Sequence, residues 1–145
     1  MTRMTFTTKI QADKSKIWDV LWGDSTYPQW TSAFFEGSHA ECEDWSEGNI
    51  VFFLSPDKNG MFSRIDKCIP NEVMTFKHLG MVKDGEKQPV NEEESWYGNL
   101  ESYYLTQEDD GVLLKAELDT EESYVESMNK SFGKAFEIVK KLSEA

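Results

Sequence analysis

The first part of the chain changes from a strand pattern to a helix pattern. Residues 4–11 carry β-branched and aromatic side chains in rough alternation, which is typical of an antiparallel strand. Apolar positions then cluster on one side of residues 13–23, between an aspartate that can cap a helix and a glycine that can end one. Pro28 suits the first turn of a further short helix over residues 27–30. The pattern therefore predicts two short helices after the first strand.

From residue 38 onward, runs of strand length are separated by turn sequences. The six predicted strands are 38–43, 49–54, 60–69, 72–81, 95–107 and 112–119. Their dividers are short and rich in Pro, Asn, Asp and Gly, so neighbouring strands are expected to be antiparallel. Residues 112–119 alternate between apolar and charged side chains, which indicates that one face of the sheet is covered.

The C-terminal residues can supply that cover. Apolar side chains recur at steps of three and four from Val125 to Leu142, which predicts one long amphipathic helix. Gly133 in its middle is a poor helix former, and we expect its missing side chain to let a sheet residue or a ligand approach closely. A chain of 145 residues has the size of one domain. The element order predicts a single α+β domain over residues 1–145, with a curved antiparallel seven-stranded sheet wrapped around the last helix.

Charge is distributed unevenly along the chain. There are 27 acidic and 15 basic residues, and the formal net charge of −12 would repel nucleic acid and anionic membrane surfaces. We therefore expect no nucleic-acid partner. Residues 84–122, here called the acidic segment, hold 13 acidic and two basic residues. This segment is either a solvated face or a docking surface for a basic partner.

Targeting signals are missing from the sequence as given. No apolar run approaches the roughly 18 residues that cross a bilayer, and the chain opens directly on strand residues rather than on a signal peptide. We expect a cytoplasmic protein without membrane insertion. Cys42 and Cys68 lie far apart without metal-binding spacing, and we interpret both as reduced packing residues.

Motifs for cofactor and metal chemistry are also missing. The sequence has no dinucleotide, nucleotide-triphosphate, zinc-protease or α/β-hydrolase motif, and only two histidines. We expect no cofactor and no metal, and we assign no catalytic residue. His78 lies in a predicted strand in which it alternates in phase with Met74 and Phe76. It is either a structural histidine or, if it faces a cavity, an acid, a base or a polar anchor for a ligand.

The aromatic residues have two possible roles. Five Trp, nine Phe and five Tyr exceed what a sheet of this size needs. They form either a bulky, fully packed core or the wall of an apolar cavity between the sheet and the helix, rimmed by a few polar groups. On residues 95–107 both strand faces are mixed, so the pattern does not decide which side chains point inward.

Several short motifs occur in a characteristic order along nearly the whole chain. They are Lys16–Leu21, Tyr27–Trp30, Asp44–Gly48, Pro70–Val73, His78–Gly80, Trp96–Gly98, Glu101–Leu105, Asp110–Gly111 and Phe132–Leu142. Their order and spacing resemble the START-like (SRPBCC, Bet v 1-like) superfamily, and within it the branch similar to the C-terminal domain of activators of the Hsp90 ATPase. The resemblance implies the helix-grip fold. Because this fold hosts carriers, cyclases and co-chaperone domains, it implies much less about activity.

The resemblance also implies a cavity between the sheet and the C-terminal helix that holds apolar small molecules. The family has no motif that marks the cavity wall, so the lining is inferred from the corresponding regions of the chain. The residues expected from these regions are Trp30, Phe52, Phe76, Trp96, Phe132 and Phe136. The other candidate ligand-binding residues are Phe35, Phe62, His78, Tyr104 and Met128.

Three functions are consistent with these observations. The first is non-enzymatic binding of a small hydrophobic molecule, lipid-like or polycyclic, by a monomer or homodimer. The second is a chaperone-associated protein-interaction module that uses the acidic segment. The third is a cyclase- or hydrolase-like enzyme in which His78 and either Glu101 or Tyr104 act as acid and base.

Overall fold

The chain forms eight strands and three α-helices in a computed structural model that describes all residues from 1 to 145. In chain order the elements are β1 (Thr2–Ile10), α1 (Lys14–Trp22), α2 (Tyr27–Thr31), β2 (His39–Glu41), β3 (Ile50–Leu54), β4 (Gly60–Ile69), β5 (Val73–Lys83), β6 (Glu86–Lys87), β7 (Leu100–Glu108), β8 (Gly111–Thr120) and α3 (Val125–Glu144). The predicted two short helices, seven strands and long helix are all present. The additional strand β6 pairs only with the end of β5.

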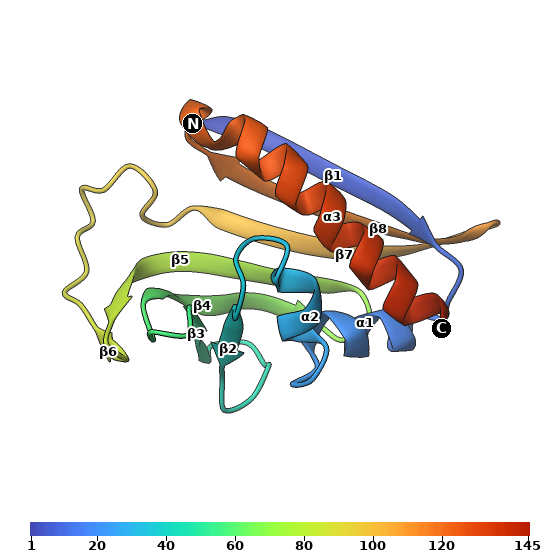
Figure 1. The fold of residues 1–145 in the computed structure, drawn as a ribbon, viewed down its shortest axis with the longest axis horizontal. Coiled ribbons are helices and arrows are strands. Elements are labelled where there is room, and N and C mark those ends of the chain that lie inside the picture. Colours follow the sequence, from blue (N-terminus) through green and yellow to red (C-terminus); the bar gives the residue numbers. More distant parts are fainter.

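The strands form one antiparallel sheet in the order β1-β8-β7-β5-β4-β3-β2. The chain begins at one edge of the sheet, and α1 and α2 carry it across to β2 at the other edge (Figure 1). Helix α3 runs diagonally along the sheet, beside β1, and ends near α1 (Figure 1). This arrangement is the predicted helix grip.

Strand periodicity explains why the helices cover one face. Every second residue of β8, from Val112 to Thr120, is buried, and the residues between them are partly exposed. On β1, the ring of Phe6 stacks on Phe132 of α3 with centroids 4.3 Å apart and planes 10° apart. The buried positions of α3 recur at helical spacing and include Phe136 and Val139. The strand and helix patterns therefore bury their apolar sides against each other.

Two irregularities bend the sheet between β4 and β5. The register shifts once between Phe62 and Ser63 and again between Ile65 and Lys67, leaving Leu79 and Asp66 without a partner in the ladder. Such bulges increase strand twist and curvature. They help to form the concave face that holds α3.

Two details of the prediction were wrong. Residues 95–99 form turns rather than the start of a strand, because Tyr97 donates to the Glu94 carbonyl and Gly98 takes a φ of 78°. Strand β7 therefore starts at Leu100. A side chain at Gly133 would meet no atom within 4 Å, so no sheet residue approaches this glycine closely. None of the helices combines the length and apolarity that crossing a membrane requires.

Candidate functional site

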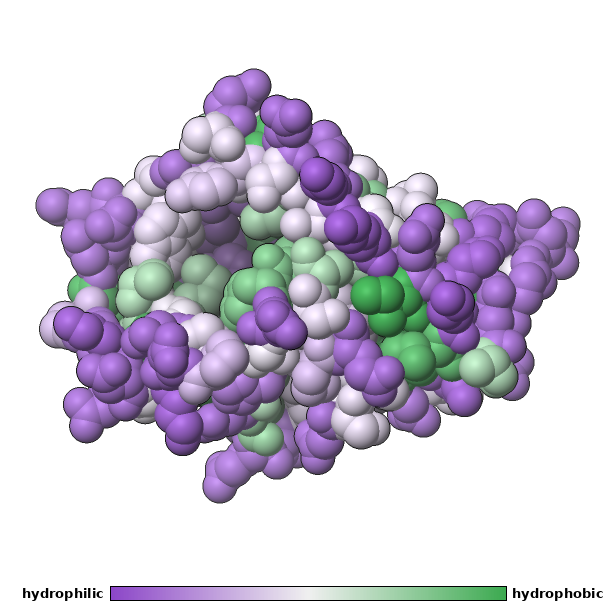
Figure 2. Space-filling model, in the orientation of Figure 1, coloured by the Kyte–Doolittle hydropathy of each residue, from purple (hydrophilic) through white to green (hydrophobic).

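A cavity of about 380 Å3 lies between the concave face of the sheet and the N-terminal half of α3. Its 17 lining residues come from α2, the following loop, β3, β4, β5, β7, β8 and α3, and 10 of them are hydrophobic. The mouth is visible as a hollow left of centre in the space-filling view (Figure 2). A volume of this size is within the range of small-molecule sites.

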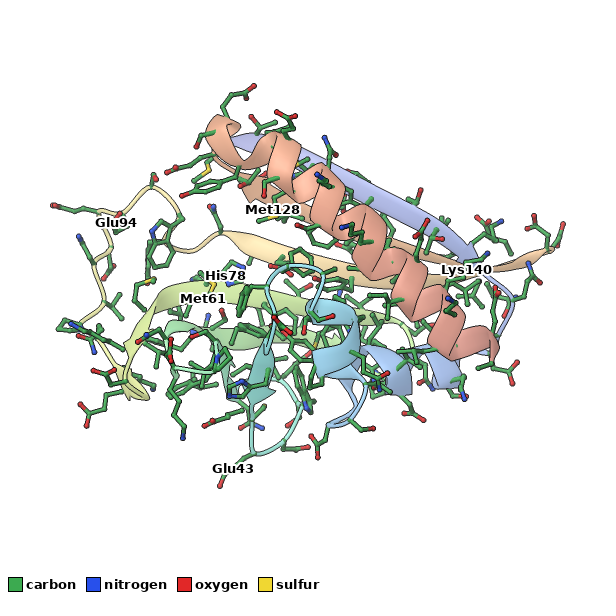
Figure 3. All side chains as sticks on the ribbon, viewed as in Figure 1. Glu43, Met61, His78, Glu94, Met128 and Lys140 are labelled. Atoms are coloured by element: carbon green, nitrogen blue, oxygen red, sulfur yellow. The ribbon has the colours of Figure 1, made fainter.

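Five of the predicted site residues line this cavity. They are Trp30, Phe35, His78, Met128 and Phe132. Met128 lies on α3, across the space from Met61 and His78, which lie on adjacent strands (Figure 3). Trp30 and Phe132 are almost fully buried, whereas Phe35 is 47% exposed at the mouth. The cavity therefore has buried aromatic residues in its wall and an accessible rim.

Phe76 and Phe136 are buried in the core beside the cavity instead of lining it. Phe76 packs edge to face against Phe53, with ring centroids 5.1 Å apart, and Phe136 packs in the same way against Phe132. The expectation that these two residues line the cavity is therefore corrected. Their rings support residues that do line the cavity.

Phe52 and Phe62 lie on the opposite face of the sheet from the cavity. They are cross-strand partners, and they pack with Leu54 and Val82 in a separate small cluster. Adjacent strand residues point to opposite faces, and it is the neighbour Phe53 that points inward, towards Phe76. The expectation that Phe52 and Phe62 line the cavity is therefore corrected.

Trp96 and Tyr104 also lie away from the cavity lining. Trp96 is half-buried in the turns before β7. Tyr104 is on the outer face of β7, where the Lys115 ammonium lies 5.0 Å from the centre of its ring. Its neighbour Tyr103 points inward and lines the cavity. Tyr103 thus occupies the position that the sequence hypothesis gave to Tyr104.

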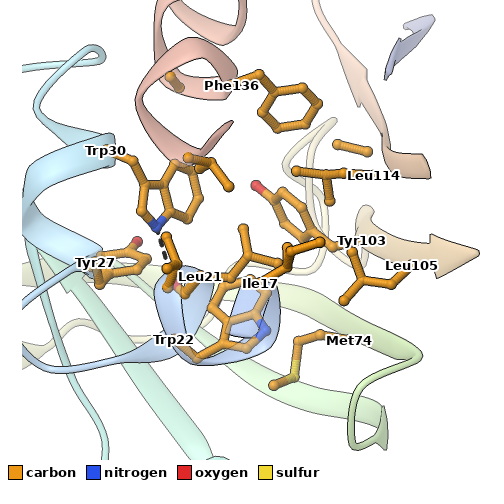
Figure 4. Close-up of a cluster of buried hydrophobic side chains, with 14 of the residues drawn as sticks. Ile17, Leu21, Trp22, Tyr27, Trp30, Met74, Tyr103, Leu105, Leu114 and Phe136 are labelled. Atoms are coloured by element: carbon orange, nitrogen blue, oxygen red, sulfur yellow. Dashed lines mark hydrogen bonds between the residues drawn. The ribbon is translucent and has the colours of Figure 1, made fainter. Parts of the chain in front are cut away.

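The aromatic residues also form a packed cluster centred on Trp22. The centroid of the Trp22 ring lies 5.2 to 6.5 Å from the ring centroids of six other aromatic residues. These are Trp18, Tyr27, Trp30, Trp45, Phe76 and Tyr103. Figure 4 shows part of this cluster, with the Trp30 indole N–H donating to the Leu21 carbonyl at 3.0 Å. The two roles considered for the aromatic residues therefore coexist: a packed core and, beside it, a cavity wall.

A chain of hydrogen-bonded polar groups crosses three neighbouring strands at the cavity wall. Ser63 Oγ on β4 lies 2.7 Å from His78 Nδ1 on β5, and His78 Nε2 lies 3.2 Å from Glu101 Oε1 on β7. The Tyr103 hydroxyl donates to the other carboxylate oxygen, Oε2. We call these four residues the polar relay. His78, Glu101 and Tyr103 line the cavity, whereas Ser63 is fully buried behind it.

Burial and hydrogen bonding shift the pKa values of the polar relay. Burial raises the pKa of the Glu101 carboxyl, but the hydrogen bond and charge of His78, together with the Tyr103 hydroxyl, outweigh it and lower this pKa overall. Burial, followed by the nearby Glu101 carboxylate, raises the pKa of Tyr103 well above its ordinary value. Burial also raises the pKa of Tyr27. The wall of the cavity therefore carries one carboxylate and neutral phenols.

Within the polar relay, His78 and Tyr103 hold Glu101, and Ser63 is too buried to contact a molecule in the cavity. Both His78 ring nitrogens are engaged, and the Ser63 hydroxyl does not reach the cavity. No three His, Cys, Asp or Glu side chains converge in a geometry that could hold a metal ion. What the arrangement offers to a bound molecule is apolar surface and a hydrogen-bond acceptor.

Several lining residues were missed at the sequence level. Tyr27, Phe34, Phe53, Met61, Tyr103 and Leu118 all face the cavity. For Tyr103 a signal existed: it shares strand parity with Glu101, which the sequence hypothesis had already paired with His78. Met61 had no such signal, because the register shift beside Phe62 is not visible in the hydrophobic pattern.

Comparisons with known proteins identify the fold. No protein-family model matches the chain, and no curated protein matches it significantly. Among solved structures, the Aha1 dimer from Colwellia psychrerythraea is 18% identical with a TM-score of 0.72, over 99% of this chain and 97% of that one. CalU16 from Micromonospora echinospora is 16% identical with a TM-score of 0.68, over 97% of this chain and 65% of that one.

DynU16, a protein of the dynemicin biosynthetic locus, is 11% identical with a TM-score of 0.68, over 96% of this chain and 46% of that one. The chain thus has the helix-grip fold that its sequence motifs predicted. At these identities the likeness concerns the fold alone.

Proposed function

We propose that this protein binds a small hydrophobic molecule, lipid-like or polycyclic, in the cavity between the sheet and α3, without transforming it. The observation that carries the proposal is the cavity of about 380 Å3, which has a largely apolar wall and a single carboxylate. Apolar cavities with a few fixed polar groups are the usual form of small-molecule sites. The fold's ligand-binding members support the same assignment.

Binding strength should come mainly from apolar burial. Each methylene group removed from water contributes about 0.8 kcal/mol, so a ten-carbon chain gains up to about 8 kcal/mol. The loss of translational and rotational freedom offsets part of this gain. For a probe such as 1-decanol we expect a Kd between about 1 µM and 1 mM.

The polar relay favours binding over catalysis. In the enzyme hypothesis, His78 exchanges a proton with the substrate, whereas in this structure its two ring nitrogens contact Ser63 and Glu101, so a substrate would have to displace one of these partners. Tyr104, one of the two partners considered, lies on the outer face of the sheet. Glu101 remains as an acceptor for a bound molecule.

The proposal can be tested by filling the cavity. Ser131 is a half-buried lining residue on α3, so Ser131→Phe places a ring in the space that the ligand would occupy. Asn129→Phe is the matched control, because Asn129 is exposed on the same helix and does not line the cavity. Binding of 1-decanol is measured by isothermal titration calorimetry, and folding by circular dichroism.

We expect Ser131→Phe to weaken 1-decanol binding at least about tenfold, which corresponds to about 1.4 kcal/mol, and Asn129→Phe to leave it within about twofold. Equal binding by wild type and a folded Ser131→Phe variant would contradict the proposed site. No binding of 1-decanol by the wild type at millimolar concentration would contradict the proposed function itself.

A second candidate is a protein-interaction role, in which the acidic segment docks on a basic surface of a chaperone or another protein. The fold likeness to an Aha1 protein and the exposed run Glu92–Glu94 favour it. That neighbour is a dimer, which is consistent with a homodimer here. Reversal of the three Glu92–Glu94 charges is the test, and partner capture that is unchanged by this reversal counts against the role.

A further inference from the structure

The polar relay leaves only one charged group free to contact a ligand. In either protonation form, His78 uses one ring nitrogen towards Ser63 and the other towards Glu101, so it offers a ligand neither a donor nor an acceptor. The single hydroxyl hydrogen of Tyr103 is committed to Glu101. What remains is the carboxylate of Glu101.

The hydrogen bonds of Glu101 do not exhaust its capacity to accept. One donor reaches each carboxylate oxygen, His78 at Oε1 and Tyr103 at Oε2, whereas an ionised carboxylate has about four lone-pair sites. The side chain keeps 25% of its surface exposed, and Glu101 lines the cavity. Free acceptor positions are therefore available to a bound molecule.

Apart from His78, whose ring nitrogens are engaged by Ser63 and Glu101, the wall contains no basic side chain that would attract an anion. None of the 17 lining residues is Lys or Arg. The other polar side chains that line the cavity, such as Tyr27, Ser38 and Ser131, carry hydroxyls, which either donate or accept. A ligand carboxylate placed at the polar end would face the Glu101 carboxylate across a partly desolvated space, where like charges repel strongly.

We propose that the cavity selects hydrophobic molecules that carry a hydrogen-bond donor, a hydroxyl or an amine, and discriminates against hydrophobic carboxylates such as fatty acids, with Glu101 as the specificity-determining residue. This inference rests on the proposed function and names its ligand class. The donor binds the free lone pairs of Glu101, while the apolar part fills the space between Met61 and Met128.

The test compares ligands that differ only in the head group. 1-Decanol, decylammonium and decanoate share the same carbon chain, and each is titrated calorimetrically into the protein of residues 1–145 at neutral pH, where decanoate is ionised. Glu101→Gln removes the charge and keeps the shape of the side chain. Glu117→Gln is the matched control: Glu117 lies on the adjacent strand β8, forms an ion pair with Lys115 and does not line the cavity.

We expect the wild type to bind 1-decanol and decylammonium at least about tenfold more tightly than decanoate. Glu101→Gln should reduce the ratio between 1-decanol and decanoate to within about threefold, and Glu117→Gln should leave it unchanged. Wild-type binding of decanoate as tight as that of 1-decanol would overturn the ligand class but not the proposed function. An unchanged ratio in a folded Glu101→Gln variant would overturn the role of Glu101. If none of the three ligands binds, both the inference and the proposed function fail.

Discussion

Replacement of Tyr103 by Phe tests the polar relay with the loss of a single oxygen atom. The hydroxyl donates to Glu101 Oε2, and Tyr103 as a whole is only 3% exposed. The substitution keeps the ring and its packing against Trp22 and Phe76. Any loss of stability therefore reports the hydrogen bond to the carboxylate.

The size of the effect follows from the charge and the exposure of the acceptor. A hydrogen bond to a charged group contributes about 1.5 to 3 kcal/mol. A quarter of the Glu101 side chain is exposed, so water can replace part of the lost hydrogen bond. We therefore expect Tyr103→Phe to lower the free energy of unfolding by an amount in the lower half of this range, about 1.5 to 2 kcal/mol. A chain of 145 residues has an unfolding entropy of about 0.3 kcal/mol/K, so Tm should fall by about 5 to 7 °C.

The loss should also depend on pH in a defined direction. The pKa of Glu101 in the folded protein is lower than the ordinary value of 4.5, so its ionised form contributes stability that is present above that value. This contribution is lost as pH falls through the folded-state pKa. Removal of the Tyr103 donor raises the folded-state pKa, and the cost of Tyr103→Phe should therefore be greatest at neutral pH and shrink in acid.

Tyr104→Phe is the matched control for this prediction. Tyr104 is the next residue on β7, but it lies on the outer face beside Lys115, away from Glu101 and the cavity. We expect Tyr104→Phe to change the free energy of unfolding by no more than about 0.5 kcal/mol. Urea unfolding followed by circular dichroism, at neutral pH and near pH 4, measures both variants. Equal costs for the two variants, or a Tyr103→Phe cost that stays constant with pH, would refute the reasoning.

Two further predictions concern glycines and use the same unfolding assay. Gly133→Ala should stabilise the protein by about 0.5 to 1 kcal/mol, because alanine is the better helix former and a Cβ there meets nothing within 4 Å. A loss of stability would show that this part of α3 is more crowded than described. Gly80→Ala should destabilise it by about 1 to 3 kcal/mol, because the added Cβ would lie 2.6 Å from the Phe62 ring. Unchanged stability would mean that the Phe62 ring does not cover Gly80.

The sequence pattern was sufficient for the architecture because the periodicities are strong and local. Alternation over residues 112–119 and helical spacing from Val125 to Leu142 each identify an element and its buried side. Turn sequences then separate the strands, and the short connections make them antiparallel. The start of the strand at residue 95 was wrong because Trp96 and Tyr97 have strand propensity, whereas Gly98 and the surrounding turns decide the backbone.

The cavity lining was harder to predict because it depends on strand parity. Phe52 and Phe53 are equally apolar neighbours, and only the tertiary contacts of Phe53 with Tyr27 and Phe76 decide which one points inward. On β7 the same ambiguity exchanged Tyr104 for Tyr103. The register shifts between β4 and β5 are equally invisible in a hydrophobic pattern, since bulges depend on pairing with another strand.

The most direct test of a ligand in this cavity is NMR of methionine methyl groups during a titration with 1-decanol. Met61 and Met128 line the cavity on the sheet and on α3, whereas Met74 is fully buried in the core and does not line it. We expect saturable shifts of the Met61 and Met128 methyl resonances, contacts from both methyl groups to the decanol chain, and no such contacts from Met74. Saturable binding without shifts of Met61 and Met128, or no binding at all, would contradict the proposed site.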